Sequence, residues 1–336
     1  MSDSFLVAVL HRQTDTPLAP GYALLAAKMK PVVRALLVDN CDPANVDAAE
    51  LLDALDLGGS RHDWASRRAS AAARRVPASL DLAACAALRN AVDSASMETL
   101  DSVDGLLEYQ LTLTSADFEA LVGADAFARL NFLAAEAHAE LQPPLRPAAA
   151  AAASAAGIAA SPHPLTEEPH EIFVRRYSAA TRPWVGFHFD RSSLTMNVAL
   201  SDDQGLEGGA LLAIVGGEVV RCDRAEGTAT LHASTLLHAV TRVQGPAARY
   251  SLILFYRQIC PAAAHRLVEC SVATMDLLYP PEEGSYSCDA CGDSRRELEE
   301  QGCLSMWHCA AGCEYDVCSL CHDVGLADGV EYVSVR

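Results

Sequence analysis

The first 145 residues place apolar side chains three and four positions apart, which is the spacing of an amphipathic helix. The pattern is clear in NVDAAELLDALDL (45–57) and in SADFEALVGADAFARLNFLAAEAHAEL (115–141), where Ser115 and Asp117 can start the helix. We therefore predict that residues 1–145 form a helical region that packs on a core supplied by the rest of the chain.

The stretch that follows has a different composition. Residues 146–164 consist mainly of alanine, with proline near both ends. Low-complexity sequence of this kind is typical of a connection between folded parts. We interpret it as a linker or an insertion, part of which can be helical.

From residue 171 to residue 258 the apolar residues gather in short runs rich in β-branched and aromatic side chains. The runs are EIFVRRY, LTMNVAL, GALLAIV, EVVRC, TATLHA and RYSLILFYR, separated by Gly, Asp and Pro turns. Many short strands at this spacing indicate an antiparallel sandwich or barrel. The sequence thus predicts an α+β protein whose β core spans residues 165–262.

Composition and charge narrow the function classes. The chain has 336 residues, 51% of them apolar, which is enough for one large domain and a smaller one. A formal net charge of -19 disfavours nucleic acid as a partner and leaves basic peptides and small molecules open. No apolar run approaches the roughly 18 residues of a membrane span, and the acidic N-terminus is a poor signal peptide. We expect no membrane association and a cytoplasmic or nuclear location.

One of the strand-like runs, GFHFDRSSLTMNVAL (186–200), carries His188 and Asp190 two positions apart. Alternate residues of a strand point to the same side, so the imidazole and the carboxylate can reach one spot. His238, near the end of a later strand-like segment, is the best-placed third ligand. Two histidines and a carboxylate form the ligand set of non-haem Fe(II) oxygenases, which leaves coordination positions open. We assign no preferred metal role to His232, which lies on the same segment as His238.

A second pair of residues lies beyond His238. Arg249 and Ser251 are again two positions apart, and a guanidinium with a hydroxyl is a fit receptor for a carboxylate. A dicarboxylate could chelate the metal at one end and reach Arg249 at the other. Tyr177, on the strand before His188, is placed to offer its phenolic hydroxyl to the same ligand.

The order of these residues resembles that of the 2-oxoglutarate- and Fe(II)-dependent dioxygenases. An HxD motif, a distant histidine and an Arg-x-Ser on the following strand are the pattern of that superfamily. The run HFDRSSLTMNVALSDDQGLEGGALLAI (188–214) is similar to its prolyl and lysyl hydroxylase branch, and the resemblance spans residues 171–258.

The resemblance implies a double-stranded β-helix (jelly-roll) core with three iron ligands, His188, Asp190 and His238. It also implies that Arg249 anchors the distal carboxylate of 2-oxoglutarate. Ser251 and Tyr177 would assist in binding the co-substrate, and Thr195 and Asn197 would line the pocket.

The activity implied is hydroxylation of an unactivated C–H bond that consumes O2 and 2-oxoglutarate and releases succinate and CO2. Fe(2+) is the implied metal and ascorbate the expected supporting reductant. A peptidyl Pro or Lys is the favoured substrate, with a small molecule as the alternative. Ala210 and the absence of an aromatic residue in GALLAIVGG (209–217) depart from the family pattern and leave the substrate open.

Seven of the twelve cysteines lie between Cys288 and Cys321. Two CxxC pairs, Cys288 with Cys291 and Cys318 with Cys321, have the spacing of a tetrahedral Zn(2+) site. We therefore predict a small zinc-binding module over residues 284–325.

Further residues in this tail could start a second zinc site. Cys309 and Cys313 would be its first ligands, and the residues that could complete it are Cys303, His308 and His322. The segment WHCAAGCEYDVCSLC (307–321) resembles ZZ-type fingers, which implies a protein-recognition role. The acidic surroundings suggest a basic peptide or a free N-terminus as its partner.

Two other functions fit parts of the sequence. A catalytically idle adaptor would use the zinc tail to bind partners and the β core as a scaffold. A cupin-like metal isomerase would share the barrel, although it has no use for Arg249 and Ser251.

Overall fold

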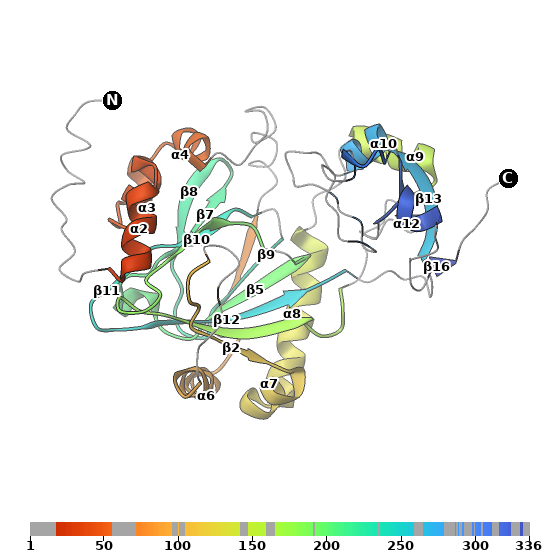
Figure 1. Ribbon diagram of the computed structural model, residues 1–336. Helices are drawn as coiled ribbons and strands as arrows, with labels where there is room; N and C mark the ends of the chain where they lie inside the picture. Colours follow the sequence, from red (N-terminus) through yellow and green to blue (C-terminus); the bar gives the residue numbers. More distant parts are fainter. Residues whose placement is uncertain are drawn as a thin grey trace. The chain divides into compact units, whose positions relative to one another are not determined.

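The structure is a computed structural model of the chain. It describes residues 18–55, 72–95, 100, 105–141, 147–158, 165–190, 192–233, 236–258, 265–278, 286, 288, 291, 298, 300–303, 305–310, 316–323 and 330–331. The chain divides into two compact units (Figure 1). The first comprises Met1–Leu57, Ala65–Leu141 and Glu167–Arg257, and the second comprises Gly58–Trp64, Gln142–Thr166 and Gln258–Arg336.

The larger sheet of the first unit has six antiparallel strands. In spatial order they are β1 (Ala73–Val76), β9 (Ala229–Ala233), β5 (Leu194–Ala199), β12 (Arg249–Tyr256), β3 (Glu171–Tyr177) and β2 (Gln110–Leu113). The two edge strands, β1 and β2, come from the region that the sequence predicts to be helical. Each has only four half-exposed residues, too few to give a clear period-two signal.

A smaller antiparallel sheet faces the larger one. Its strands, in spatial order, are β4 (Val185–His188), β10 (His238–Val240), β7 (Leu211–Val215) and β8 (Glu218–Cys222), and β6 (Glu207–Gly208) pairs separately with β11 (Val243–Gln244). Tyr177 of the larger sheet packs with Val185, Leu211 and Val240 of the smaller one. The first unit is therefore a mixture of helices and two facing antiparallel sheets with a core between them.

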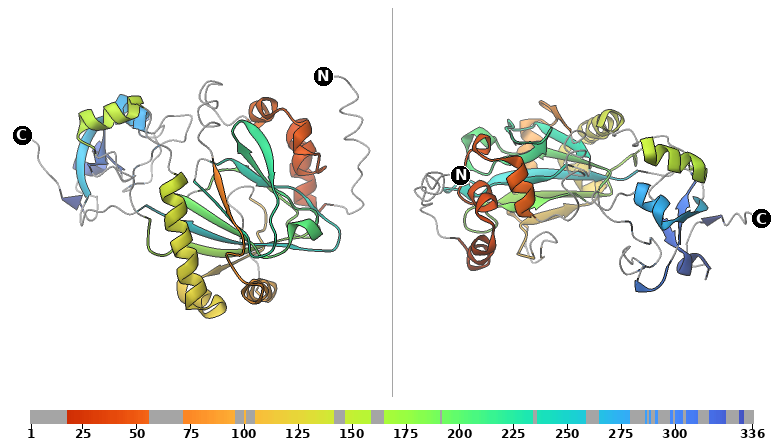
Figure 2. Two further views of the ribbon diagram at one scale, coloured as in Figure 1. Left: turned by 180° about the vertical axis from the view of Figure 1, so that it is seen from behind. Right: turned by 90° about the horizontal axis from the view of Figure 1, so that it is seen from above.

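Helices cover the outer face of the larger sheet (Figures 1 and 2). They are α6 (Leu82–Asp93), α7 (Ser115–Val122) and α8 (Ala124–Leu141). Alternate residues of β12 point outward to them: the Tyr250 hydroxyl donates to Asp93 at 2.9 Å, and the Tyr256 hydroxyl donates to Asn131 at 2.9 Å. The other residues of β12, including Arg249 and Ser251, therefore point inward.

The predicted helix over residues 115–141 is two helices, because the chain breaks at Gly123, whose φ of 87° favours glycine. Thr114 caps α7: its hydroxyl oxygen accepts from the Asp117 backbone N–H at 3.1 Å. The helix thus begins at Ser115, as predicted, with the residue before it as the cap.

The remaining elements of the first unit are short. They are α2 (Pro20–Lys28), α3 (Pro31–Leu37), η1 (Pro43–Asn45), α4 (Ala48–Leu55) and η2 (Asp203–Gly205). The Arg242 backbone N–H donates to the Leu37 carbonyl at 2.6 Å, which ties α3 to the segment after β10. Tyr22 of α2 packs edge-on against buried Trp184, with ring centroids 4.7 Å apart.

The second unit has its own four-stranded sheet and helices. Its elements are α9 (Pro147–Ala156), β13 (His265–Ser271), α10 (Val272–Leu278), β14 (Ser305–Cys309), β15 (Asp316–Cys318), α12 (Ser319–Asp323) and β16 (Val330–Glu331). Ala153 and Ile158 belong to its hydrophobic core, so the alanine-rich segment is more than a connection. Alanine forms helix readily and its small side chain allows close packing, which the low-complexity pattern conceals.

Among the described residues, no helix combines the length and the apolar character that crossing a membrane requires.

Candidate active site

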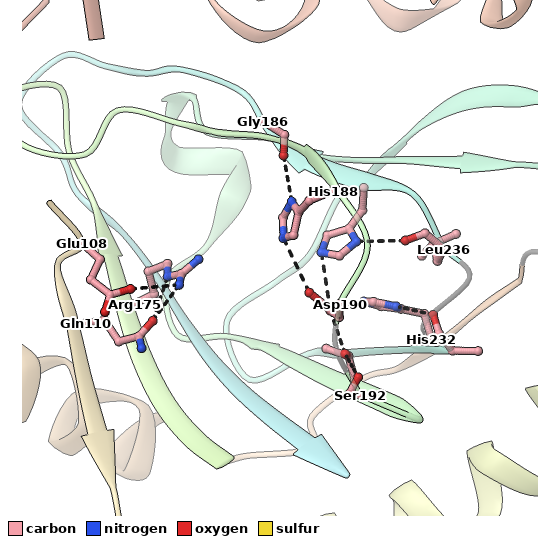
Figure 3. A network of polar contacts seen from close by, with 12 residues as sticks. Glu108, Gln110, Arg175, Gly186, His188, Asp190, Ser192, His232 and Leu236 are labelled. Carbon is pink, nitrogen blue, oxygen red and sulfur yellow. Dashed lines mark hydrogen bonds and ion pairs between the residues drawn. The ribbon is translucent and has the colours of Figure 1, made fainter. Parts of the chain in front are cut away.

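His188, Asp190 and His238 meet between the two sheets (Figure 3). His188 ends β4, His238 begins β10, and the two are cross-strand partners with ring centroids 4.4 Å apart. Asp190 Oδ1 lies 3.5 Å from His188 Nε2, and Asp190 Oδ2 lies 3.6 Å from His238 Nε2. One ligand atom from each residue lies within 4.8 Å of the others. The structure thus brings together the three residues that the sequence singled out.

Backbone carbonyls fix the orientation of both imidazole rings. His188 Nδ1 donates to the Gly186 carbonyl at 2.8 Å, and His238 Nδ1 donates to the Leu236 carbonyl at 3.1 Å (Figure 3). A carbonyl can only accept, so each Nδ1 carries a proton, and in the neutral form of each ring Nε2 turns a lone pair toward Asp190. This is the arrangement of a histidine prepared to bind a metal.

Burial strengthens the same arrangement. Burial, with a smaller contribution from neighbouring His238, lowers the pKa of His188 to about 4, so the His188 ring is neutral near pH 7. Burial alone would raise the pKa of Asp190, but the histidines around it and a hydrogen bond from Thr195 bring that pKa to about 2. The pocket therefore presents neutral imidazole and an ionised carboxylate, which is the donor set that a divalent cation requires.

A third histidine, His232, approaches Asp190 from the larger sheet. Its Nε2 lies 3.6 Å from Asp190 Oδ2, and its Nδ1 donates to the Ala233 carbonyl at 3.0 Å. Burial lowers the pKa of His232 to about 4. No sequence pattern favoured His232 as a residue of the site, because its position depends on β9 lying beside β5, and only the strand order reveals that.

A cavity of about 670 Å³ opens beside the metal-binding residues, and both sheets line it. Its apolar wall carries four aromatic rings, those of Phe173, Phe187, Phe189 and Phe255. Arg175 lies on the opposite side from the histidines in Figure 3 and donates to the Gln110 side-chain oxygen from Nε at 3.1 Å and from Nη2 at 2.7 Å. A substrate in this space would contact the aromatic rings and the guanidinium of Arg175, which Gln110 holds in place.

Arg249 begins β12 and is fully buried. Its guanidinium carbon lies 5.1 Å from the centre of the ring of Tyr177, its cross-strand partner on β3. None of its three nitrogens has a hydrogen-bond partner among the described residues, and the same holds for Ser251 Oγ. Burial, with a smaller contribution from nearby Arg224, lowers the pKa of Arg249 to about 10, so the side chain is charged near pH 7. Buried polar groups normally have partners, so these donors indicate a binding site for an anion.

The position of Arg249 differs from the simplest expectation. Tyr177 and Asn197 line the cavity, whereas Arg249 and Ser251 are absent from the lining that the described residues form. Tyr177 contacts both the cavity and the guanidinium, and it offers the face of its ring to Arg249. Tyr177 thus links the cavity lining to Arg249 through a direct contact of its ring.

In the second unit, the four sulfurs of Cys288, Cys291, Cys318 and Cys321 lie within 4.8 Å of one another. The Cys318 backbone N–H donates to Cys288 Sγ at 3.3 Å, and the Cys321 backbone N–H donates to Cys318 Sγ at 3.4 Å. Four convergent sulfurs with backbone donors fit a tetrahedral zinc ion.

The residues named for a second zinc site are less concentrated. Cys309 is buried on β14 but belongs to neither of the metal-ligand clusters that the described residues form, and Cys313 lies outside the described residues. His308 Nδ1 lies 2.6 Å from Asp316 Oδ1, and the His322 ring stacks on Trp307 at 3.6 Å. The second zinc ion stays a prediction.

Comparison with known proteins gave structural likenesses only. No family model and no curated protein matches the sequence. A prolyl-4-hydroxylase from Pseudomonas putida has 14% identity and a TM-score of 0.39 over 63% of this chain and 99% of its own. The viral collagen prolyl hydroxylase of Paramecium bursaria Chlorella virus-1, in its 2OG complex, has 12% identity and a TM-score of 0.38, covering 56% and 96%.

A 2OG-Fe(II) oxygenase family protein from Burkholderia pseudomallei has 15% identity and a TM-score of 0.38, covering 59% of this chain and 91% of its own. TM-scores of this size are weak likenesses. The function proposed below therefore rests on the side chains of this chain.

Proposed function

We propose that the first unit is an Fe(II)- and 2-oxoglutarate-dependent dioxygenase built on a double-stranded β-helix. The observation that carries the proposal is that a candidate metal site and a candidate anion site lie in the same core. His188 and His238 converge with ionised Asp190, and Arg249, a buried cation without a hydrogen-bond partner among the described residues, lies on the facing sheet. A metal site alone would not explain the buried arginine, and an anion site alone would not explain the convergence of two histidines and a carboxylate.

The residues present fit an iron ion. His188 Nε2, His238 Nε2 and one oxygen of Asp190 would hold it, and the carbonyls of Gly186 and Leu236 keep the two rings turned toward it. Two histidines and one carboxylate leave positions for a co-substrate and O2, and bound iron supplies the oxidation of a C–H bond. The protein holds the ligands in place and encloses the reaction in a cavity lined with aromatic rings.

Arg249 and Ser251 would bind the distal carboxylate of 2-oxoglutarate. Their donors are buried and have no partner among the described residues, and a carboxylate can accept from a guanidinium and a hydroxyl together. Tyr177 would turn to admit the co-substrate, since its ring now lies between the cavity and the guanidinium. Thr195 would fix the carboxylate ligand by its 2.7 Å hydrogen bond to Asp190.

The substrate class that we propose is a peptidyl Pro or Lys residue, and a free small molecule is the alternative. The cavity has room for a side chain of that size, because its volume is about 670 Å³ and four phenylalanine rings line it. A cyclic or aliphatic side chain would pack against the phenylalanine rings while its backbone amides stayed near the mouth.

The second unit is proposed to bind one zinc ion through Cys288, Cys291, Cys318 and Cys321, and to serve as a protein-recognition module. The convergence of the four sulfurs supports the zinc ion. Recognition of a basic peptide is supported only by the net charge of -19.

The test of the enzyme proposal is succinate release from 2-oxoglutarate in air, with Fe(II) and ascorbate present. The wild-type chain should release succinate, and His188→Ala and Asp190→Asn should not. Asp223→Asn is the matched control, because Asp223 is exposed and pairs with Arg221 in a surface contact of 2.6 Å. A wild-type chain that binds iron but releases no succinate would favour the idle adaptor.

A further inference from the structure

Arg224 is a buried arginine beside Arg249, and no sequence pattern singled it out. Arg224 follows β8 and is fully buried. Its Nε donates to Asp203 Oδ2 at 3.1 Å, and its Nη1 donates to Asn197 Oδ1 at 2.6 Å. Asn197 lines the cavity that holds the metal-binding residues. Arg224 is thus connected, through one side chain, to the site proposed for catalysis.

Asp203 is shared between two arginines. Its Oδ2 accepts from Arg224, and its Oδ1 lies 3.7 Å from Arg249 Nε. All three side chains are at most 2% exposed, and together they carry two positive charges and one negative charge. A buried charge without a counterion is costly, so the group has room for one more negative charge.

The free donors point to the same conclusion. Among the described residues, five buried donor atoms in this group have no hydrogen-bond partner: Nε, Nη1 and Nη2 of Arg249, Nη2 of Arg224, and Oγ of Ser251. A carboxylate has about four lone-pair sites on its two oxygens, enough to accept from two guanidiniums and a hydroxyl. If Arg224 served only to hold Asp203, its fork could give two nitrogens to that carboxylate, but it gives one.

We propose that Arg224 is a second cation for the distal carboxylate of 2-oxoglutarate, acting together with Arg249 and Ser251. Asp203 holds both arginines in place, and the bound carboxylate brings the group to neutrality. The site then selects a 2-oxo dicarboxylate over a 2-oxo monocarboxylate of the same length. The inference rests on the proposed function, since it assigns a contact within the same co-substrate site.

The test compares two ligands on the full chain loaded with Fe(II) without oxygen. Calorimetry gives the Kd of 2-oxoglutarate and of 2-oxopentanoate, which has a methyl group in place of the distal carboxylate. We expect Arg224→Gln to weaken 2-oxoglutarate binding roughly 10- to 100-fold, the usual effect of losing a hydrogen bond to a charged group. The same variant should change the Kd of 2-oxopentanoate less than about twofold, because the metal end of the site is untouched.

Two further variants separate a direct contact from support of the fold. Arg221→Gln is the matched control on β8: Arg221 is 46% exposed and should leave both Kd values unchanged. Arg224→Lys keeps the positive charge beside Asp203 and protects the fold, but its single nitrogen cannot replace the separate Nη2 of the guanidinium, so binding of 2-oxoglutarate alone should weaken. Equal weakening of both ligands, or no change for 2-oxoglutarate in both Arg224 variants, would overturn the proposal.

Failure of the underlying function would look different. In that case the wild-type chain would show no preference for 2-oxoglutarate over 2-oxopentanoate, and Arg249→Gln would have no effect on either. If the wild-type chain prefers 2-oxoglutarate, and that preference depends on Arg249 but not on Arg224, the proposed function stands and the role of Arg224 is refuted.

Discussion

Thr195 and His232 are cross-strand partners on β5 and β9, and both approach the same oxygen of Asp190. The Thr195 hydroxyl donates to Asp190 Oδ2 at 2.7 Å, and His232 Nε2 lies 3.6 Å from that atom. Asp190 stands just beyond the end of β4, so no strand pairing holds it. The larger sheet thus positions the carboxylate, while the smaller sheet supplies both of the histidines proposed as ligands.

Thr195→Val should weaken Fe(II) binding roughly 10- to 100-fold, the effect usual for loss of a group that orients a metal ligand. Valine has nearly the same shape but cannot donate to Asp190, so the carboxylate is free to rotate. Anaerobic titration with Fe(II) measures the change. Thr112→Val on the edge strand β2 is the matched control, and equal affinity in the two variants would show that Thr195 does not position Asp190.

The metal-free protein should lose stability as the pH falls from about 6.5 toward 4. His188 and His232 have pKa values of about 4 when folded, against an ordinary value of 6.5. Between these two pKa values the unfolded chain binds more protons than the folded one, so the free energy of unfolding decreases as the pH is lowered. Above pH 6.5 both states are neutral at these rings and the effect is absent.

Thermal melting of the metal-free chain at pH 7, 6 and 5 measures this slope. Replacement of both histidines by Gln should flatten it. A wild-type melting temperature that does not change from pH 7 to pH 5 would mean that these rings are not buried in the neutral form.

Gly209→Ala should impair 2-oxoglutarate binding more than Fe(II) binding. Gly209 has a φ of 70°, and an added Cβ would lie 3.2 Å from Arg249 Cδ and 3.0 Å from Val243 Cγ2. The methyl group would therefore push on the arginine proposed to anchor the co-substrate. Gly216→Ala is the matched control, because its φ of 60° brings similar strain with nothing within 4 Å of the new Cβ. Comparable co-substrate affinities in the two variants would contradict the assigned position of Arg249.

Cys318→Ser should remove one zinc equivalent from the chain and destabilise the second unit. Its sulfur is one of four that converge, and a zinc ion held by thiolates contributes directly to folding. Cys270→Ser is the control within the same unit, since Cys270 lies on β13 and belongs to neither of the metal-ligand clusters that the described residues form. Metal analysis of the purified variants decides between them, and a zinc content that Cys318→Ser leaves unchanged would refute the four-cysteine site.

The residues that the sequence could predict are those set by local spacing. Arg249 and Ser251 share one face of β12 because alternate residues do so in any strand, and His188 and Asp190 lie two positions apart where β4 ends. The two CxxC pairs are likewise local patterns, and the four sulfurs converge as expected.

The residues that the sequence could not predict are set by strand order and by turns. His232 reaches Asp190 because β9 lies beside β5. Arg224 and Asp203 lie outside the strands, so no alternating pattern in the sequence indicates which way their side chains point. Tyr177 contacts Arg249 through its ring, a rotamer that no sequence pattern encodes.

The most direct measurement of the central claim is anaerobic calorimetry of 2-oxoglutarate binding with and without Fe(II). If the histidines, Asp190 and Arg249 form one site, 2-oxoglutarate binds one per chain, requires Fe(II), and is lost in both Asp190→Asn and Arg249→Gln. Binding that ignores the metal, or that survives both substitutions, would contradict the account.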